Sequence, residues 1–556
     1  MITSFKLKCG RVAGALGEPV NTTPVTVFVG PNNSGKSKVL SEIERYCRTG
    51  EKDPRAVILE DVCFSGLSAT SADLAIERIS QLPHLDESLQ LDHIIVGSRN
   101  ERQQVPLAEL RRHMQLPTGN LGAFCHWFLK HNTLSLDGRN RINLVNEQEA
   151  GDLQRPAQSS LQVLFRDEAK RQEVRRIIAD AFETFFVIDP TNLGRLRIRL
   201  SDKPPNDEIE ERGIHAAAIA FHAGAQLIDQ ASDGVKAFSG IVAELIAGDP
   251  SVVLIDEPEA FLHPSLASKL GNEISRAAMS SDKRVFVSTH SPTFVMGCIQ
   301  SGAPVTIVRL TYRRGVATAR VLPSAEILKM MRHPLLRSTD VLSGLFYEFV
   351  VVTESDADRA FYQEVNERLL QFRAEWGVPN CLFLNAQNKQ TIPTIVRPLR
   401  KLGIPAVSIV DLDVLKDGGS TWTNVLSSAD IPEISHPSFA TMRGAVKLAL
   451  ESTGKDMKRE VGVAILEGKN REVATNLLSQ LAEYGVFIVP GGELESWMKH
   501  LAACGHGPNW LVEIFEKMGE DPASMNYVKP TEEDVWKFLS DVGGWLVNPN
   551  RKGMPV

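Results

Sequence analysis

Long apolar runs are missing from this sequence of 556 residues. No stretch approaches the roughly 18 consecutive apolar residues that a membrane-spanning helix needs. Residues 1–10 also lack the apolar block and the small-residue cleavage site of a secretory signal. We therefore expect a cytoplasmic protein without a membrane partner.

Cysteine is scarce and scattered. The seven cysteines form no CxxC pair, which argues against a disulfide framework and against a zinc site. Repeats with the periods of solenoids or coiled coils are also absent. What remains is an ordinary globular composition, with 43% hydrophobic and 23% charged residues. The length favours about two to four domains.

An excess of positive charge is lacking as well. The net charge of −7 and the isoelectric point near 6.1 mean that nothing global attracts a polyanion, so a DNA surface requires a local patch. Taken alone, each basic cluster is more typical of a solvated helix face or turn. The candidate patches are Lys170, Arg171, Arg175 and Arg176; Arg309, Arg313 and Arg314; and Arg397, Arg400 and Lys401.

A phosphate-binding pattern lies near the N-terminus. The β-branched run Val25–Val29 predicts a buried strand, and it leads directly into GPNNSGKS at residues 30–37. Glycines at these positions let backbone N–H groups point at phosphate oxygens, and the helix that follows adds its positive N-terminal dipole. In this pattern the lysine bridges the β- and γ-phosphates of ATP and the serine binds Mg²⁺. The expected nucleotide-binding residues are Gly30, Asn32, Asn33, Ser34, Gly35, Lys36 and Ser37.

A second apolar strand, predicted at residues 251–255 (SVVLI), delivers two acids, Asp256 and Glu257. Asp256 fits the acid on the Mg²⁺ side of an ATP site, and Glu257 fits the base that orients the attacking water. In isolation, an acidic pair after a strand is also typical of a helix N-terminus.

Two further pieces accompany these motifs. The predicted strand Arg284–Ser288 places His290 where a contact to the γ-phosphate is useful, although a histidine there also fits a core position. Upstream, Ser232 and Gly234 precede an apolar helix, with Ser232 as a plausible cap and Gly234 allowing close approach.

The order of these pieces resembles the ABC-type ATPase heads of the SMC-like and OLD (overcoming lysogenization defect) families. The resemblance covers about the first 300 residues and implies two heads that sandwich two ATP molecules. It makes Ser232 and Gly234 the signature contact to the opposite subunit's ATP, and His290 the switch histidine. Ser-Asp-Gly replaces the usual transporter signature, which makes a transporter less fitting. Residues 54–226 mix helical stretches with strand candidates at 134–145 and 196–200, and they are interpreted as insertions into the head. By the resemblance, a helical element at about 150–225 mediates dimerisation.

The second half presents acids at the ends of further strands. After strand-like residues 305–310 and 316–321 comes a helical connector, placed at 326–345. Residues 349–352 then predict a strand that leads into Glu354 and Asp358, and an amphipathic helix follows. Ala406–Val410 leads into Asp411 and Asp413, and residues 486–489 lead to Glu493 and Glu495.

These acids are expected to gather at one edge of a parallel α/β sheet. Carboxylates held together raise each other's pKa unless a divalent cation neutralises them. Because these are hard oxygen ligands, and we expect no Cys or His near them, they select Mg²⁺ or Mn²⁺ over zinc. Two such ions activate water and stabilise the leaving oxygen in phosphodiester cleavage.

The acidic pattern resembles the Toprim domain of topoisomerases, primases and OLD-family nucleases. Glu354 matches the first catalytic glutamate, although Ser355 replaces the usual neighbouring glycine. Asp358, Asp411 and Asp413 match further acids of the family, and Glu495 is preferred to Glu493 as the last acid. The tail at residues 548–555 resembles a basic motif of OLD nucleases in which a lysine contacts the scissile phosphate; Lys552 is assigned this role, with Arg551 as its rival.

The predicted fold class is therefore α/β: an ABC-type ATPase head with a helical insertion (1–325), the connector, and a largely parallel Toprim domain with helical insertions and C-terminal helices (346–556). The resemblance implies an ATP-regulated endonuclease or nickase that cuts DNA in anti-phage defence. It implies a homodimer, and as partners a helicase or a retron reverse transcriptase with its msDNA. Two alternatives stay open: an SMC-like sensor or scaffold without nuclease activity, and a topoisomerase, for which none of the six tyrosines is assignable.

Overall fold

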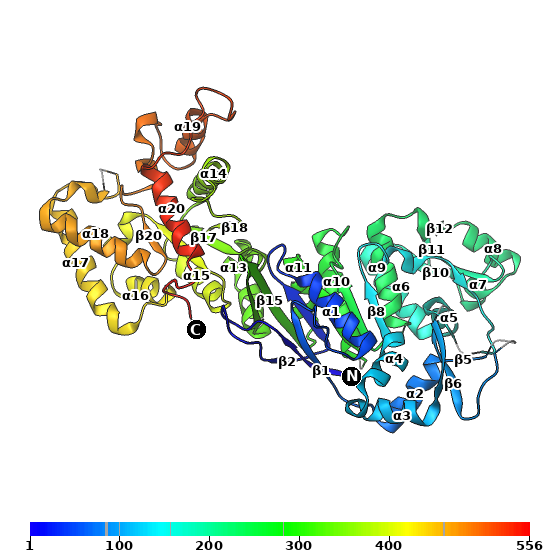
Figure 1. The fold of residues 1–556 in the computed structure, drawn as a ribbon. Coiled ribbons are helices and arrows are strands. Elements are labelled where there is room, and N and C mark those ends of the chain that lie inside the picture. Colours follow the sequence, from blue (N-terminus) through cyan, green and yellow to red (C-terminus); the bar gives the residue numbers. More distant parts are fainter. Residues whose placement is uncertain are drawn as a thin grey trace. The chain divides into compact units, whose positions relative to one another are not determined.

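The chain forms two compact units, Met1–Leu328 and Lys329–Val556. The computed structural model describes residues 1–83, 87–98, 101–155, 157–248, 250–281, 283–459 and 462–555. Figure 1 follows the chain from the blue N-terminus through the first unit to the red helix α20 of the second. Among the described residues, every helix is too short or too polar to cross a bilayer.

The first unit is built around a six-stranded sheet. Its strand order is β16-β15-β3-β14-β13-β8, and all neighbouring pairs are parallel except β15 with β16. The central strands are apolar because both faces of the sheet are covered. The strands are β3 (Val25–Val29), β8 (Thr133–Leu136), β13 (Val252–Asp256), β14 (Arg284–Ser288), β15 (Val305–Arg313) and β16 (Val316–Leu322).

Helices follow the strands of this sheet. After β3 comes α1 (Lys36–Thr49), α9 (Asp233–Ile246) precedes β13, and α10 (Pro264–Met279) and α11 (Pro292–Gln300) flank β14. The last two helices pack so closely that a Cβ at Gly271 would collide with Phe294 O, and a Cβ at Gly297 would collide with Ser268 O. Glycine is therefore required at this helix crossing.

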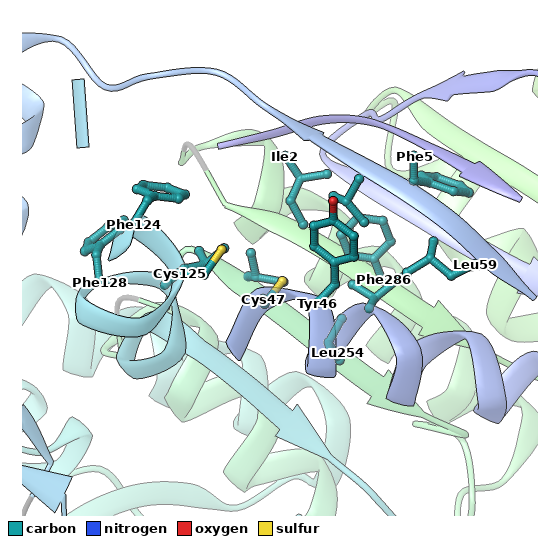
Figure 2. Packing of buried hydrophobic residues seen from close by; sticks show 14 of the residues in the cluster. Ile2, Phe5, Tyr46, Cys47, Leu59, Phe124, Cys125, Phe128, Leu254 and Phe286 are labelled. Atoms are coloured by element: carbon teal, nitrogen blue, oxygen red, sulfur yellow. The ribbon is translucent and has the colours of Figure 1, made fainter. Parts of the chain in front are cut away.

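A smaller antiparallel sheet covers α1. It consists of β1 (Ile2–Leu7), β2 (Pro19–Asn21) and β4 (Leu59–Phe64). Figure 2 shows the core between them, with Tyr46 and Cys47 of α1 beside Phe286. The ring of Phe5 meets that of Phe286 edge-on at 6.1 Å. This core anchors the helix that follows the phosphate-binding loop.

The interpretation of residues 54–226 as insertions is wrong in part. Within this range β4 pairs with β1, and β8 is the edge strand of the central sheet beside β13. β8 lies largely within the strand candidate at 134–145, but its place in the central sheet could not be predicted, because its sequence TLSL is half polar and only partly buried at the edge. The remaining elements are α2 (Ala69–Ile79), β5 (Ser80–Gln81), β6 (His93–Ser98), β7 (Glu101–Pro106), α3 (Leu107–Gln115) and α4 (Leu121–Trp127).

The segment at about 150–225 is not purely helical either. Its strands form an antiparallel sheet of order β10-β11-β12, with β9 paired to β11. Helices lie between and around them. The elements are β9 (Gln148–Glu149), α5 (Ser160–Arg166), α6 (Glu168–Phe182), β10 (Phe185–Asp189), β11 (Arg195–Ser201), α7 (Glu208–Arg212), α8 (Ala216–Ala223) and β12 (Gln226–Leu227).

The second unit contains a four-stranded, fully parallel sheet, which confirms the predicted parallel α/β arrangement. Its order is β18-β17-β19-β20. Three of these strands match the predicted apolar runs, and β18 is an additional edge strand. They are β17 (Phe349–Thr353), β18 (Cys381–Asn385), β19 (Ala406–Val410) and β20 (Val486–Ile488).

Helices form the connector, and further helices pack around the second sheet. α12 (Ser324–Arg332) and α13 (Pro334–Ser338) form the helical connector. The hydrophobic core of the second unit joins its sheet to α14, α19 and α20 through Phe361, Trp510 and Trp536. The helices are α14 (Asp356–Phe372), α15 (Ile392–Lys401), α16 (Gly419–Ser428), α17 (His436–Ser452), α18 (Gly468–Ala482), α19 (Pro508–Met518) and α20 (Asp534–Val547).

Candidate functional site

The loop between β3 and α1 has the backbone that phosphate binding requires. Gly30, Asn33 and Gly35 have φ angles of 144°, 61° and 95°, in the left-handed region that glycine adopts readily. A Cβ at Gly30 would collide with Leu310 O. The glycine at this position is thus demanded by both conformation and space.

Lys36 is buried under this loop. Its Nζ donates to Gly30 O at 2.9 Å and to Pro31 O at 2.8 Å. Burial lowers the pKa of Lys36 to about 8, while Glu257 and Asp256 oppose the shift. Ser34 Oγ is buried and has no hydrogen-bond partner within the part of the chain that is described. A buried cation, an unsatisfied hydroxyl and a left-handed backbone fit a phosphate group.

Asp256 and Glu257 lie at the end of β13, beside the end of β14. Asp256 accepts a hydrogen bond from Ser288 Oγ, because the parallel register pairs these two residues. Glu257 has a left-handed φ of 51°, and its Oε1 lies 3.3 Å from His290 Nε2. Burial lowers the pKa of His290, with Lys36 adding to the effect. The structure thus places Asp256 and His290 around Glu257, within the electrostatic reach of Lys36.

Glu259 is a residue of this site to which sequence reasoning gave no role. Its Oε1 accepts from Thr289 Oγ1 and from His290 N, both at 2.8 Å. Burial raises its pKa. The carboxylate therefore fixes the loop that carries His290. Its position two residues after Glu257 in the DEPE sequence was the only signal for it.

Ser232 and Gly234 lie at the start of α9. Ser232 is exposed and caps the helix by accepting from Val235 N at 3.5 Å. Gly234 is buried, and a Cβ there would come within 2.6 Å of Phe261 O. The capping role and the close approach are present. A contact from these residues to the nucleotide of a second copy stays a prediction, as does the role of the exposed Ser37 at Mg²⁺.

In the second unit, Glu354 and Asp411 meet although 57 residues separate them. Asp411 N donates to Glu354 Oε1 at 2.9 Å. Burial and then Asp411 raise the pKa of Glu354 to about 8, and burial and then Asp358 raise that of Asp411 to about 7. Parallel pairing of β17 with β19 puts both acids at the same edge of the sheet. A divalent cation at this edge would favour the charged form of both carboxyls.

Asp358 lies in the first turn of α14. Its Oδ2 accepts from Ser355 N at 2.9 Å and from Ser355 Oγ at 2.7 Å, which closes a capping box. Burial raises the pKa of Asp358, and Glu495 acts in the same direction. Ser355 therefore supplies the helix cap. The same cap orients Asp358 near the other acids.

Glu493 and Glu495 follow β20, and His506 joins them. Ligand atoms of these three side chains lie within 4.8 Å of one another, and His506 Nδ1 is 2.7 Å from Glu495 Oε1. Glu493 is 6% exposed, and burial raises its pKa. The expectation that no histidine lies near these acids is therefore wrong. His506 lies in a loop far from any strand end, so strand patterns could not reveal it.

Two lysines that sequence reasoning missed reach the same acids. Lys458 Nζ lies 2.9 Å from Asp411 Oδ2 and 3.8 Å from Glu493 Oε2. Lys389 Nζ lies 3.1 Å from Asp413 Oδ1 and equally far from Asp417 Oδ2. Burial alone would lower the pKa of Lys458, but Asp411 raises it overall. Both lysines come from loops without a recognisable motif.

The assignment of Lys552 to the acidic site is wrong in this structure. Its Nζ pairs with Glu483 Oε2 at 2.5 Å. Glu483 precedes β20, whereas the acids follow the strands, so Lys552 lies at the opposite edge of the parallel sheet. The tail is held there because the buried Arg400 donates to Gly553 O and, at the start of β19, to Ala406 O. The rival Arg551 donates to Leu546 O at 2.9 Å, at the end of α20.

The candidate basic patches are also corrected. Arg171 and Arg175 are buried and pair with Glu211. Arg309 and Arg400 are buried as well. Each of the three clusters therefore has at least one arginine in the interior, and only its remaining members can contact phosphate at the surface.

Comparison with known proteins bears on the first unit. Residues 167–296 match the model of a family described as "AAA domain, putative AbiEii toxin, Type IV TA system". The matched segment contains Ser232, Asp256, Glu257 and His290, and it supports an ATPase of the AAA or ABC type in the first unit. No curated protein matches the sequence.

Solved structures of SMC heads resemble the chain distantly. The SMC head domain from Thermotoga maritima has 14% identity and a TM-score of 0.29, over 58% of this chain and 99% of that one. The Smc head domain with an extended coiled coil, bound to the C-terminal domain of ScpA and derived from Pyrococcus furiosus, has 12% identity and a TM-score of 0.33, over 59% and 98%. TM-scores this low carry no conclusion about function.

Proposed function

We propose that this chain is an ATP-binding ABC-type ATPase whose second unit is a Toprim-type, metal-dependent DNA endonuclease of the OLD kind, controlled by nucleotide. The supporting match to an AAA model concerns the first unit alone. The nuclease, its DNA substrate and its control by ATP rest on the arrangement of side chains.

In the first unit, Lys36 would bind the β- and γ-phosphates, and Ser37 and Asp256 would hold Mg²⁺. Glu257 would orient the attacking water, and His290, 3.3 Å from it, would contact the γ-phosphate. Ser232 and Gly234 would complete the site of a second copy, so the working form would be a homodimer. Glu259 would keep the His290 loop in place through its two hydrogen bonds.

The observation that carries the nuclease is the contact between Glu354 and the backbone of Asp411. Asp358, Asp413 and Glu495 complete the acidic edge and would hold Mg²⁺ or Mn²⁺. Bound cations of this kind activate water and stabilise the leaving oxygen of a phosphodiester. Their positive charge would also lower the raised pKa values of Glu354 and Asp411.

Two side chains refine this picture. His506 adds an imidazole nitrogen to the ligands near Glu493 and Glu495, which favours Mn²⁺ over Mg²⁺ at that position. Lys458 replaces Lys552 as the cation beside the acids. At a DNA-cleaving site, its ammonium would move from Asp411 to the scissile phosphate as the metal takes over the carboxylate.

The test is cleavage of supercoiled plasmid DNA with Mg²⁺ or Mn²⁺, with and without ATP. We expect cutting that Glu354→Gln abolishes and that Lys552→Ala leaves unchanged, because Lys552 lies at the far edge of the sheet. Equal cutting with and without ATP would remove the regulation and leave the nuclease. Cutting by Glu354→Gln at the wild-type rate would end the nuclease proposal.

The biological setting we propose is defence against phage. The matched family model, described as a toxin of a toxin–antitoxin system, is compatible with a DNA-damaging effector. A helicase, or a retron reverse transcriptase with its msDNA, would be the partner that releases cutting. Expression of the wild-type chain and of Glu354→Gln in phage-challenged bacteria compares protection directly.

A second candidate is an SMC-like ATPase that senses or scaffolds without cutting. The observation that favours it is the pairing of Asp411 with Lys458 and of Asp413 with Lys389, because lysines that neutralise the acids reduce the need for metal. Failure of Mn²⁺ to bind the wild-type chain would favour this function. The topoisomerase alternative fares worse, since Tyr362, near the acids, is buried with its hydroxyl accepting from Trp497 Nε1.

A further inference from the structure

A buried arginine lies directly beneath the acids of the ATPase site. Arg141 is 1% exposed and follows β8, immediately before a 3₁₀ turn at Ile142–Val145. Its Nη1 donates to Asp256 O at 3.0 Å and also to Glu257 O. The guanidinium therefore binds two consecutive carbonyls at the point where β13 ends.

These hydrogen bonds go to the backbone of the acids and leave their carboxylates available. Burying a charged guanidinium is costly unless it is well hydrogen-bonded. Burial lowers the pKa of Arg141, while Glu259, Glu257 and Asp256 oppose the shift. An apolar side chain would fill the same space without this cost, so the arginine points to a role in holding the loop that follows β13.

The part of the loop that has to be held is the backbone of Glu257. A left-handed conformation costs a residue other than glycine about 1 kcal/mol or more, and Glu257 has a φ of 51°. Its N–H donates to Ser288 O at 2.9 Å, and its carbonyl accepts from Arg141. The peptide groups on both sides of the Cα are thus held, which leaves the side chain to reach His290.

Arg141 is itself held from two sides. Its guanidinium lies 5.7 Å from the centre of the Phe261 ring. Its 3₁₀ turn packs on α9 at Gly240, where a Cβ would come within 2.7 Å of Leu144 Cβ and 3.2 Å of Arg141 O. The same helix begins with Ser232 and Gly234, so the arginine connects that helix to the catalytic loop.

We infer that Arg141 is a positioning residue for ATP hydrolysis: it holds the strained backbone of Glu257 so that the carboxylate faces the attacking water. The inference rests on the proposed role of Glu257 as base. It predicts that Arg141 affects the rate of the chemical step more than the affinity for ATP.

The experiment compares Arg141→Ala, Arg141→Lys and the control Arg139→Ala, which removes an exposed arginine from the same turn. For Arg141→Ala we expect kcat of ATP hydrolysis to fall roughly 10- to 100-fold, the effect of a misplaced catalytic group, with a KM for ATP within about threefold of wild type. Arg141→Lys should recover part of kcat because an ammonium can still donate to one carbonyl. Arg139→Ala should behave as wild type.

Hydrogen exchange provides a readout that does not depend on hydrolysis. The amide of Glu257 and those of residues 259–262 should exchange faster in Arg141→Ala and in Arg141→Lys than in Arg139→Ala. Should Arg141→Ala not fold, the lysine variant decides. Unchanged exchange in this segment, or a loss of ATP affinity that matches the loss of kcat, would overturn the inference.

Failure of the proposed function looks different. If Glu257→Gln hydrolyses ATP at the wild-type rate, Glu257 is not the base. The exchange comparison then still decides whether Arg141 holds the loop: faster exchange supports the structural half of the inference, and unchanged exchange overturns it.

Discussion

The two acidic sites of this chain are built alike and balanced differently. In each, acids stand at the carboxyl ends of parallel strands. In the first unit, Glu257 faces His290, and the buried ammonium of Lys36 lies within its electrostatic reach. In the second, Glu354 and Asp411 meet each other in a buried place, and their pKa values rise to about 8 and 7.

This difference indicates the charge of the ligand that each site can bind. The ATPase site carries its own positive charge and presents a loop for an anion. The second site carries more negative charge than its two lysines relieve, and so it is suited to cations. Removal of a carboxylate should therefore weaken cation binding at the second site, and removal of a lysine should weaken anion binding at the first.

The largest effect is expected for Asp411→Asn. Loss of this carboxylate should reduce metal-dependent DNA cleavage roughly 1000-fold, since a bound metal supplies several kcal/mol of charge stabilisation. Calorimetry with Mn²⁺ should show weaker binding, while ATP binding stays the same. Retention of full cleavage would mean that the second site is not what we propose.

Lys36→Ala should weaken ATP binding about 100-fold, because a buried, charge-assisted contact to phosphate contributes about 3 kcal/mol. Binding of a fluorescent ATP analogue measures the change. The exposed Lys38, in the first turn of the same helix, gives the matched control Lys38→Ala. Equal affinity of the two variants would contradict the role of Lys36.

The raised pKa values predict a pH dependence of stability in the second unit. Folded Glu354 has a pKa of about 8 against an ordinary value of 4.5, so the folded state binds more protons between these values. The stabilisation from protonation is complete below pH 4.5 and is lost as pH rises through 8. We expect the unfolding midpoint in urea with EDTA to fall from pH 5 to pH 8, and Mn²⁺ to restore it at pH 8.

Tryptophan fluorescence is a suitable probe for this measurement, because every tryptophan except Trp127 lies in the second unit. In Glu354→Gln the fall should be smaller, since one titrating group is gone. A midpoint that rises with pH in EDTA would contradict the direction of the shifts.

The smallest effect is expected for Ser232→Ala. Loss of the cap of α9 should lower the free energy of unfolding of the first unit by about 0.5–1 kcal/mol, because its hydrogen bond is long at 3.5 Å. Thermal unfolding measures this. If Ser232 also contacts ATP across a dimer, its loss should reduce ATP-dependent dimerisation, which Asp233→Ala should leave unchanged.

The sequence predicted the apolar strands of both parallel sheets well, including the edge strands β16 and β20, and it missed the edge strand β18. Val25–Val29 and Ala406–Val410 are continuous apolar runs, because both faces of a parallel sheet are covered, and both strands have the predicted bounds. Thr133–Leu136 lies largely within a strand candidate, but its mixed composition and partial exposure hide its place at the edge of the central sheet. The acids that follow apolar strands could therefore be found, while partners from loops could not.

What the sequence alone determined is the set of groups that strands and tight turns deliver: the GPNNSGKS loop, Asp256 with Glu257, and the acids Glu354, Asp411 and Asp413. Only the tertiary structure decided that Arg141, Lys458 and His506 join them and that Lys552 does not. Such contacts depend on how loops distant in sequence return to the sheet. No local pattern records this, because it follows from the packing of the whole unit.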